Sequence, residues 1–310
     1  MPVVSFSIIT PSLNARSFIA EAIASVMEQQ IPDVEHIIID GGSTDGTLEL
    51  LKQYPHLIVV SEPDRGMYDA INKGIRMARG EWIGLLNADD LYPKGSLKQA
   101  LEIVEQNPDL HVMNGGYVVF EDHGDERRIV QVSPSIGKDE LWPRIVHGHT
   151  VPNSWFIRRS LFDLCGFYDS RYRFAADREL IMRFALAGIH LFSLPGVNYW
   201  FRQHERSATF SKQDSRIPER GNLRIRIALE MLSIQEEYLT KKNLPAEMRK
   251  ELLKSHSATT YKLVVTALFH RKWRLAMSGI WRGCRYDISW PFTFLLLLVR
   301  RIQKEAEIHA

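Results

Sequence analysis

The sequence of 310 residues holds only two cysteines, Cys165 and Cys284, and neither belongs to a C-x-x-C motif. This excludes a disulfide framework, and a reducing compartment is the simpler interpretation. No apolar run reaches the about 20 residues that a membrane-spanning helix needs. The first residues carry no basic segment before an apolar one, so no signal peptide is expected. With 45% hydrophobic and 25% charged residues, the composition indicates a folded protein of about two domains rather than a disordered or polytopic membrane protein.

Two common nucleotide-binding motifs are also missing. No G-x-G-x-x-G follows the first apolar run, where Pro11-Ser-Leu-Asn14 stands instead. No G-x-x-x-x-G-K-[ST] occurs in the chain. Dinucleotide oxidoreductases and P-loop NTPases therefore lose their main sequence support.

Charge is distributed unevenly along the chain, whose net charge is +2. Between Tyr261 and Lys304 there are nine Lys and Arg but one acid, Asp287, whereas the rest of the chain carries a net charge of −6. An acidic body is not typical of a nucleic-acid-binding enzyme, and no nucleic-acid partner is expected. The basic tail predicts contact with an anionic partner.

The tail also combines basic residues with aromatic ones. Ile288–Val299 is a run of twelve mostly apolar residues, too short to span a bilayer. Three of the seven tryptophans lie in or near it: Trp273, Trp281 and Trp290. This pattern predicts an element lying in a membrane interface. The alternative is a helix that packs on the body or on a second subunit.

Strand and helix patterns alternate in the first 110 residues. Strands are predicted at 5–10, 36–40, 57–61 and 82–87, and helices at 17–29, 68–78 and 95–106, with another helix capped by Ser43 or Thr44. The pattern then predicts a hairpin of strands at 113–120 and 127–132, a helix at 176–187, helices at 223–240 and 246–267, and a last helical segment from Trp290. Strand–helix alternation with short connections predicts an α/β fold with a parallel, doubly wound sheet.

Acidic side chains fall where the predicted strands end. Asp40 ends the second strand, Asp64 follows the third, and Asn87, Asp89 and Asp90 follow the fourth. In an open parallel sheet, ligands bind outside the carboxyl ends of the strands. Carboxylates gathered at one edge are typical of a Mg²⁺ or Mn²⁺ site completed by phosphate oxygens. The pattern therefore predicts a metal-chelated diphosphate as the ligand. Each acid taken singly could instead cap a loop or be merely solvated.

Several motifs together resemble a known family. They are Ser7–Asn14, Ile39–Gly46, Glu62–Gly74, Ala78–Gly80 and Leu85–Asp90. They resemble family 2 glycosyltransferases, in particular a bacterial subgroup that builds cell-surface polysaccharides such as colanic acid and O-antigen. The resemblance covers about residues 3–210. It implies the GT-A fold, a Rossmann-like and mostly parallel sheet with flanking helices, and a transfer that inverts the anomeric carbon of a nucleotide-diphosphate sugar.

The resemblance also implies residues for the nucleotide. Pro11, Leu13 and Asp40 line the base and ribose pocket, and Asp40 receives the base. Asn14 and Asp64 belong to the same nucleotide and donor side.

Lys73 is a candidate neighbour of the phosphates, or else a solvated charge on a helix. For the metal, a divalent Mn²⁺ or Mg²⁺, the resemblance implies that Asp90 is a ligand. Asp89 meets the ribose or donor sugar and contributes to the metal site. The chain departs from the family's D-x-D pattern because Asn87 stands at its first position.

The catalytic base implied by the resemblance is Asp177, in the segment Phe174–Leu180. An inverting transfer needs a carboxylate that takes the proton of the acceptor hydroxyl. Glu179 is two residues further along and points elsewhere on a helix. The alternative role for Asp177 is an N-cap of the helix.

Three histidines allow a second metal hypothesis. His147 and His149 have strand-like spacing, and with His204 they allow a zinc site, although no cysteine accompanies them. The resemblance instead implies an acceptor-side position for His149 and a segment containing Arg202 and His204 that folds over the donor diphosphate. Arg202 is also assigned to the acceptor side and His204 to the metal, and Trp155 is a candidate for stacking on an acceptor sugar or for the core.

These observations predict a metal-dependent inverting hexosyltransferase. Residues 1–212 are expected to form the GT-A catalytic domain, with a nucleotide-sugar half at 1–110 and an acceptor and base half at 111–212, and residues 213–310 a helical region. The expected partners are a UDP-sugar or GDP-sugar donor, a glycan or polyprenyl-diphosphate-linked acceptor, and a membrane surface contacted by the tail. The expected location is the cytoplasmic face of the bacterial inner membrane. The alternatives are a non-catalytic nucleotide- or glycan-binding protein on the same fold and a sugar nucleotidyltransferase.

Overall fold

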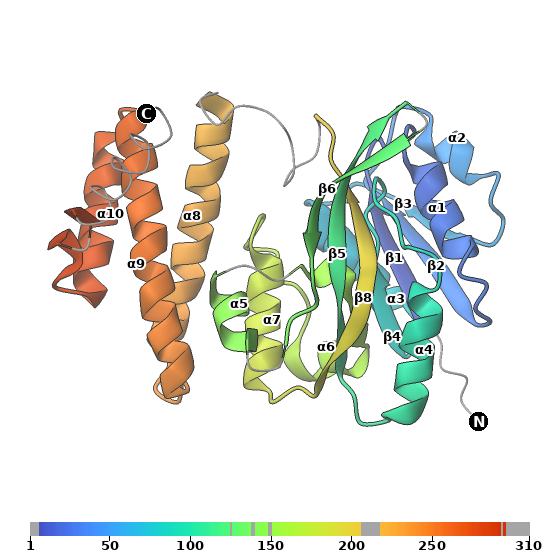
Figure 1. Ribbon diagram of the computed structural model, residues 1–310. Coiled ribbons are helices and arrows are strands. Elements are labelled where there is room, and N and C mark those ends of the chain that lie inside the picture. The colour runs from blue at the N-terminus through green and yellow to red at the C-terminus, as the bar shows by residue number, and fades with distance from the viewer. Residues whose placement is uncertain are drawn as a thin grey trace. The chain divides into compact units, whose positions relative to one another are not determined.

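The computed structural model describes residues 6–124, 126–137, 140–147, 151–205, 218–292 and 294–295, and the chain forms two compact units, Met1–Lys212 and Gln213–Ala310. The first unit is a mixed α/β structure on an eight-stranded sheet (Figure 1). The strand order is β3-β2-β1-β4-β7-β5-β6, and β8 pairs with β5. The strands are β1 (Phe6–Ser12), β2 (Val34–Asp40), β3 (Ile58–Ser61), β4 (Trp82–Leu85), β5 (Val112–His123), β6 (Glu126–Ser133), β7 (Trp155–Arg158) and β8 (Leu191–Arg202).

The first four strands form the parallel half of the sheet, and each is followed by a helix. The register pairs Ser12 of β1 with Asp40 of β2, and Asp40 with Ser61 of β3. The loops that follow these strands therefore begin at one edge of the sheet. This confirms the predicted α/β class with a mostly parallel sheet. The helices are α1 (Ile19–Met27), α2 (Thr47–Leu51), α3 (Met67–Met77) and α4 (Ser96–Gln106).

The second half of the sheet is mostly antiparallel. The predicted hairpin is confirmed as β5 and β6, but the sequence pattern predicts neither β7 nor β8. Strand β7 has only four residues, and it joins the halves by pairing antiparallel with both β4 and β5. Strand β8 contains Pro195-Gly196, which reads as a turn in isolation. Its parallel pairing with β5 continues on either side of that interruption, with two register shifts.

The helix starts show where local patterns were misleading. Neither Ser43 nor Thr44 caps α2, because the helix begins at Thr47 after Gly46, whose φ is +90°. His147 is the last residue of α5 (Leu141–His147) and is not part of a strand. The strand-like spacing of residues 147 and 149 therefore does not place their side chains on one face of a strand. The remaining helices of this unit are the 3₁₀ turn Pro152–Ser154, α6 (Ser160–Cys165) and α7 (Ala176–Leu186).

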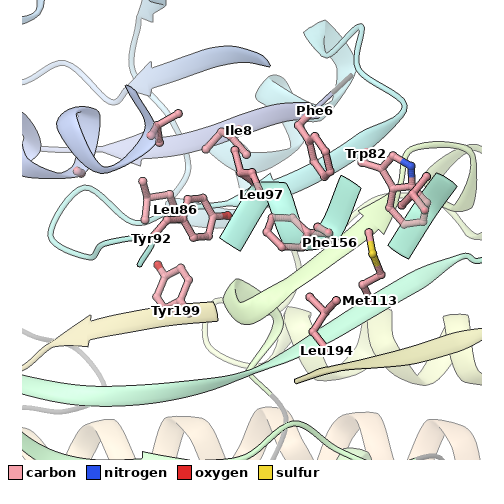
Figure 2. Close-up of a cluster of buried hydrophobic side chains, with 14 of the residues drawn as sticks. Phe6, Ile8, Trp82, Leu86, Tyr92, Leu97, Met113, Phe156, Leu194 and Tyr199 are labelled. Carbon is pink, nitrogen blue, oxygen red and sulfur yellow. The ribbon is translucent and has the colours of Figure 1, made fainter. Parts of the chain in front are cut away.

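A cluster of buried side chains joins the two halves of the sheet (Figure 2). Phe6 of β1 packs edge-on against Phe156 of β7, with ring centroids 5.5 Å apart. Leu97 of α4 and Tyr199 of β8 belong to the same cluster. Trp155, the neighbour of Phe156, is 1% exposed. Burial of these large rings fixes β7 and β8 against the parallel strands.

The second unit consists of α8 (Pro218–Leu239), α9 (Ala246–Phe269) and α10 (Trp273–Tyr286). The first two helices were predicted, whereas α10 was not, and the helical segment expected from Trp290 is described only as far as residue 295. Within the described ranges, no helix is both long and apolar enough to cross a membrane.

Candidate active site

Asp90 lies in the loop after β4 and is bonded from three sides. Its carboxylate accepts hydrogen bonds from Asn87 Nδ2 (2.8 Å), Tyr199 Oη (2.8 Å) and the Arg202 backbone N–H (2.9 Å). Burial raises the pKa of Asp90 well above its usual range, and the negative charge of Asp89 raises it further. The side chain is 2% exposed. Asp90 therefore fastens the loop to β8, and its geometry differs from that of an open metal ligand.

Asp89 has the opposite environment. Its side chain is 32% exposed, and its Oδ2 lies 2.9 Å from His204 Nε2. The imidazole of His204 stacks on Phe18, with ring centroids 4.7 Å apart. Of the two adjacent acids, Asp89 is thus the one with an accessible carboxylate. It lies beside the imidazole of His204, and imidazole is also a common metal ligand.

Arg202 is a structural residue of this region. Its side chain is 2% exposed and forms ion pairs with Glu21 (2.9 Å) and Asp122, and its Nε donates to the Asp89 carbonyl (2.9 Å). The guanidinium also lies 5.3 Å from the Phe18 ring centroid. The side chain of Arg202 is thus bonded inside the fold, and its expected acceptor-side role stays a prediction.

A cleft of about 740 Å³ adjoins Arg202 and contains no other residue predicted for the site. Its walls come from the start of α1, the β5–β6 hairpin and the end of β8. They are Ser17, Phe18, Glu21, Asp122, Gly124, Glu126, Arg127, Trp200 and Arg202.

Asp40, expected to receive the base, is fully buried. Its carboxylate accepts hydrogen bonds from the backbone N–H groups of Gly42 (3.0 Å) and Ser43 (2.9 Å), from Ser61 Oγ (2.8 Å) and from Ser43 Oγ. Oδ2 accepts three of these bonds and Oδ1 accepts one. Asp40 therefore shapes the loop after β2, and its contact with the nucleobase stays a prediction.

Asp64 occupies the space beside that loop. A Cβ placed on Gly41 would come within 2.5 Å of Asp64 Oδ2 and 3.5 Å of Leu13 Cδ1. Asp64 Oδ1 accepts the Gly66 N–H (2.8 Å), and among the described residues no hydrogen-bond donor reaches Oδ2. Leu13 is 61% exposed. The missing side chain at Gly41 thus brings one carboxylate oxygen and one exposed apolar side chain together at the strand-end edge.

The other residues predicted for the nucleotide hold loops in place. Asn14 accepts the Thr44 N–H (2.9 Å) while its own N–H donates to Ser43 Oγ (2.7 Å). Lys73 Nζ lies 2.8 Å from Glu62 and 3.1 Å from the Pro63 carbonyl oxygen. The bonds of Asn14 connect the loops after β1 and β2, and those of Lys73 join α3 to the loop after β3. Pro11 lies within β1, paired in register with Ile39.

Asp177 is the second residue of α7, whose N-cap is Ala175, so it is not the N-cap residue. Its carboxylate accepts a hydrogen bond from the Tyr68 hydroxyl and one from the Arg178 N–H (2.8 Å). Burial raises the pKa of Asp177 above its ordinary value, and the positive charge of Arg178 together with these hydrogen bonds only partly opposes the rise. The neighbouring acid Glu179 is paired with Arg183 Nη2 at 2.7 Å. Asp177 is therefore a buried acid with a raised pKa, held by a hydrogen bond from Tyr68.

Tyr68 is a functional candidate that the sequence patterns did not reveal. Its ring stacks on Tyr168, with centroids 5.2 Å apart. Asn72, one turn further along α3, donates to the Tyr168 carbonyl (2.8 Å) and accepts its N–H (3.0 Å). Helix α3, which follows the Asp64 loop, is thereby joined to the segment that precedes Asp177. The helical spacing of Tyr68 and Asn72 indicated that they share one side of α3. Their common partner, Tyr168, lies about 100 positions away and could not be predicted from this spacing.

Trp155 and His149 complete the predicted set. Trp155 is 1% exposed and belongs to the core, which is one of the two roles expected for it. His149 lies outside the described residues. The described part of the chain contains no cluster of three or more His, Cys, Asp or Glu able to hold a metal ion. Asp89 and His204 alone would leave several coordination positions for substrate oxygens and water.

The chain shares its fold with solved structures of the GT-A type. TarS 1-349 of S. aureus, solved with UDP, has a TM-score of 0.53 at 16% identity, over 93% of this chain and 92% of TarS 1-349. The mannosyltransferase PcManGT of Pyrobaculum calidifontis, solved with GDP-Man and Mn²⁺, has a TM-score of 0.58 at 18% identity, over 94% of this chain and 86% of its own.

The family is defined by sequence. The model of glycosyl transferase family 2 matches residues 7–165, and the chain belongs to this family. A PGL/p-HBAD biosynthesis glycosyltransferase of Mycobacterium bovis is 29% identical over 184 residues, 57% of this chain and 68% of the relative. The putative teichuronic acid biosynthesis glycosyltransferase TuaG of Bacillus subtilis is 31% identical over 147 residues, 46% of this chain and 58% of TuaG.

Proposed function

We propose that this glycosyltransferase moves a sugar, with inversion, from a nucleotide-diphosphate sugar to a hydroxyl group of a surface glycan acceptor. The main support is the shared edge of strands β1 to β4, where Leu13, Asp64 and Asp89 stand on the loops after β1, β3 and β4. The relatives named for glycolipid and teichuronic acid synthesis support a cell-envelope acceptor. Crystals of the structural neighbours with UDP, UDP-GlcNAc and GDP-Man support the donor class.

The metal belongs in this proposal on Asp89 rather than Asp90. Asp89 and His204 offer an accessible carboxylate and an imidazole, which suit Mn²⁺ or Mg²⁺ with diphosphate oxygens as further ligands. A divalent ion there supplies positive charge for the leaving diphosphate. Asp90, Tyr199 and Arg202 keep the loop in position.

Asp177 acts as the general base in the proposed reaction. It takes the proton of the acceptor hydroxyl as that oxygen attacks the anomeric carbon. Tyr68 orients the carboxylate by donating to it. If the donor is α-linked, inversion predicts a β-linked product, so the coupling constant of the new anomeric proton in the NMR spectrum tests the mechanism. A product of retained configuration would rule out the single displacement assigned to Asp177.

Asp64 and Leu13 form the base subsite in this proposal. A carboxylate accepts the imide N–H of uracil or the N1–H of guanine, whereas cytosine offers no such ring N–H, and Leu13 covers an apolar face of the ring.

Changing Gly41 to Ala is expected to weaken nucleotide binding. The added methyl group conflicts with Asp64 Oδ2 and Leu13, and loss of one charged hydrogen bond at about 1.5–3 kcal/mol raises Kd about 10- to 150-fold. Titration calorimetry with UDP and GDP measures the change. Gly137→Ala is the matched control, since no heavy atom stands within 4 Å of its added Cβ. Equal affinity in both variants would remove Asp64 from the base subsite.

The proposal also covers the division of the chain into domains, the carrier of the acceptor and the location of the protein. Residues 1–212 would be the catalytic domain, with donor and acceptor halves meeting near residue 110, and residues 213–310 an accessory helical region. The acceptor would be carried on a polyprenyl diphosphate at the cytoplasmic face of the inner membrane. A sugar nucleotidyltransferase or a non-catalytic binding protein would give no glycosidic product in the same assay.

A further inference from the structure

Helix α10 carries an exposed apolar stripe. Trp273, Met277 and Trp281 recur every four residues and therefore share one side of the helix. Each is 63–64% exposed, and Phe269, four residues before Trp273, is 64% exposed. Contiguous apolar surface of this kind is uncommon on a soluble monomer and marks an interaction site. We call Trp273, Met277 and Trp281 the α10 stripe; Phe269 is the last residue of α9.

The opposite side of α10 fixes how the stripe is presented. A Cβ on Gly279 would come within 2.7 Å of Val264 of α9, and Gly283 packs directly against the indole of Trp290. Trp290 is 1% exposed and belongs to a buried cluster with Val264. This corrects the sequence-based prediction for Trp290, which is a core residue and not an interface residue. Because the glycine side of α10 is packed, the stripe is directed outward from this unit.

The chain after α10 continues the exposed apolar surface. Ile288 is 93% exposed, Phe292 78% and Leu295 58%. Of the run 288–299 that predicted an interfacial element, these residues lie within the described part, and 296–299 lie outside it.

Cations border the stripe without acidic partners. Arg271, Arg274 and Arg285 form no ion pair with a described residue, and Arg285 lies over the Trp281 ring at 5.5 Å from its centroid. Arg282, by contrast, is held by Glu236 of α8 at 2.7 Å. From residue 262 to residue 292 the only acid is Asp287. The stripe therefore combines tryptophans with positive charge that no acid of the described residues pairs with.

We propose that the α10 stripe docks this protein on the surface of an anionic phospholipid bilayer. Tryptophan and methionine side chains enter the boundary between head groups and acyl chains, while Arg271, Arg274 and Arg285 meet lipid phosphates. A second copy of the chain fits this surface less well, because pairing two stripes would place the same uncompensated cations opposite each other. The proposal does not depend on the identity of the donor or the acceptor.

Flotation of the full chain with vesicles tests the docking. The wild type is expected to float with phosphatidylcholine vesicles that contain phosphatidylglycerol, and to bind pure phosphatidylcholine vesicles much less. The double variant Trp273→Ser/Trp281→Ser is expected to lose at least about tenfold in partition because apolar burial is lost. Arg274→Gln and Arg285→Gln are each expected to lose about fivefold, with the remaining binding weaker at high salt.

Control measurements distinguish a loss of membrane docking from a loss of folding and from a change in dimerisation. Leu164→Ser removes an exposed apolar side chain from α6, where Leu164 is 74% exposed, and should float like the wild type. Nucleotide-induced thermal stabilisation should be the same in all variants, since the residues proposed for the donor site all belong to the first unit. Unchanged flotation of the double tryptophan variant would overturn the proposal. So would a wild-type dimer in light scattering that the same variant converts to a monomer without a change in vesicle binding.

Discussion

Replacing Asp177 by Asn is expected to lower kcat for sugar transfer by about 10²–10⁴-fold, the range that one positioned general base contributes. The amide has the size of the carboxylate but cannot take the proton of the acceptor hydroxyl. Initial-rate kinetics with the natural donor measure the loss. Asp163→Asn on α6 is a suitable control because Asp163 is largely exposed and makes only a 4.0 Å contact with Arg159. A wild-type kcat in Asp177→Asn would place the base elsewhere.

The pH profile adds a readout that a merely structural role would not change. Burial raises the pKa of Asp177, and only the ionised carboxylate accepts a proton. The value of kcat/KM should therefore rise with pH through this raised pKa, and its acid limb should lie above the pH of an ordinary Asp. The Tyr68 hydroxyl stabilises the ionised form, so Tyr68→Phe is expected to move the acid limb to still higher pH. An acid limb in the same position would exclude Tyr68 as the positioning residue.

Replacing Asp89 by Asn is expected to abolish the Mn²⁺-dependent part of stabilisation by a nucleoside diphosphate. A ligand at 100 times its Kd stabilises by about 2.7 kcal/mol, which corresponds to a rise in Tm of about 5–10 °C for a unit of this size. Thermal unfolding with UDP, GDP, CDP and dTDP, with and without Mn²⁺, measures it. The nucleotide that gives the metal-dependent shift also identifies the base of the donor.

Asp90→Asn is the matched control for Asp89, and the opposite pattern is expected. Asp90 accepts three hydrogen bonds inside the fold, so its replacement should lower the Tm of the free protein by disturbing a buried network. The metal-dependent nucleotide shift should remain. If Asp90→Asn removes that shift while Asp89→Asn keeps it, the metal ligand is Asp90 and the assignment made from exposure is wrong.

The two adjacent acids, Asp89 and Asp90, show why the sequence could locate the candidate site but could not assign a role to each acid. The strand-end position of residues 89 and 90 follows from the strand–helix alternation, which is a local pattern. Which of the two carboxylates reaches solvent depends on Tyr199 and Arg202, more than 100 residues away on a strand that the local pattern did not predict. The same holds for Asp40, which accepts hydrogen bonds from its own loop and from Ser61, and for Asp64, whose place beside Leu13 depends on the absence of a side chain at Gly41.

Position 177 shows a different division between sequence and structure. Its place at the start of a helix was predictable, because apolar periodicity and Gly188 mark that helix. The hydrogen bond from Tyr68 and the burial that raises the pKa come from the joining of α3 to the segment around Tyr168. The roles of Trp155 and Trp290, which are both buried in the apolar core, likewise depend on the tertiary structure. An isolated tryptophan has no local signal that separates stacking on a ligand from packing in a core.

The sequence by itself determined the class of this protein: an α/β glycosyltransferase fold with its acids at strand ends, a helical C-terminal region and a basic, aromatic tail. These features depend on residue periodicity and on ordered motifs, which are local along the chain. Only the tertiary structure decided which acid is open to a metal, which one shapes a loop, and which tryptophans are exposed. Burial and hydrogen-bond partners decide those roles, and they come from strands and helices far apart in the sequence that meet only in the folded chain.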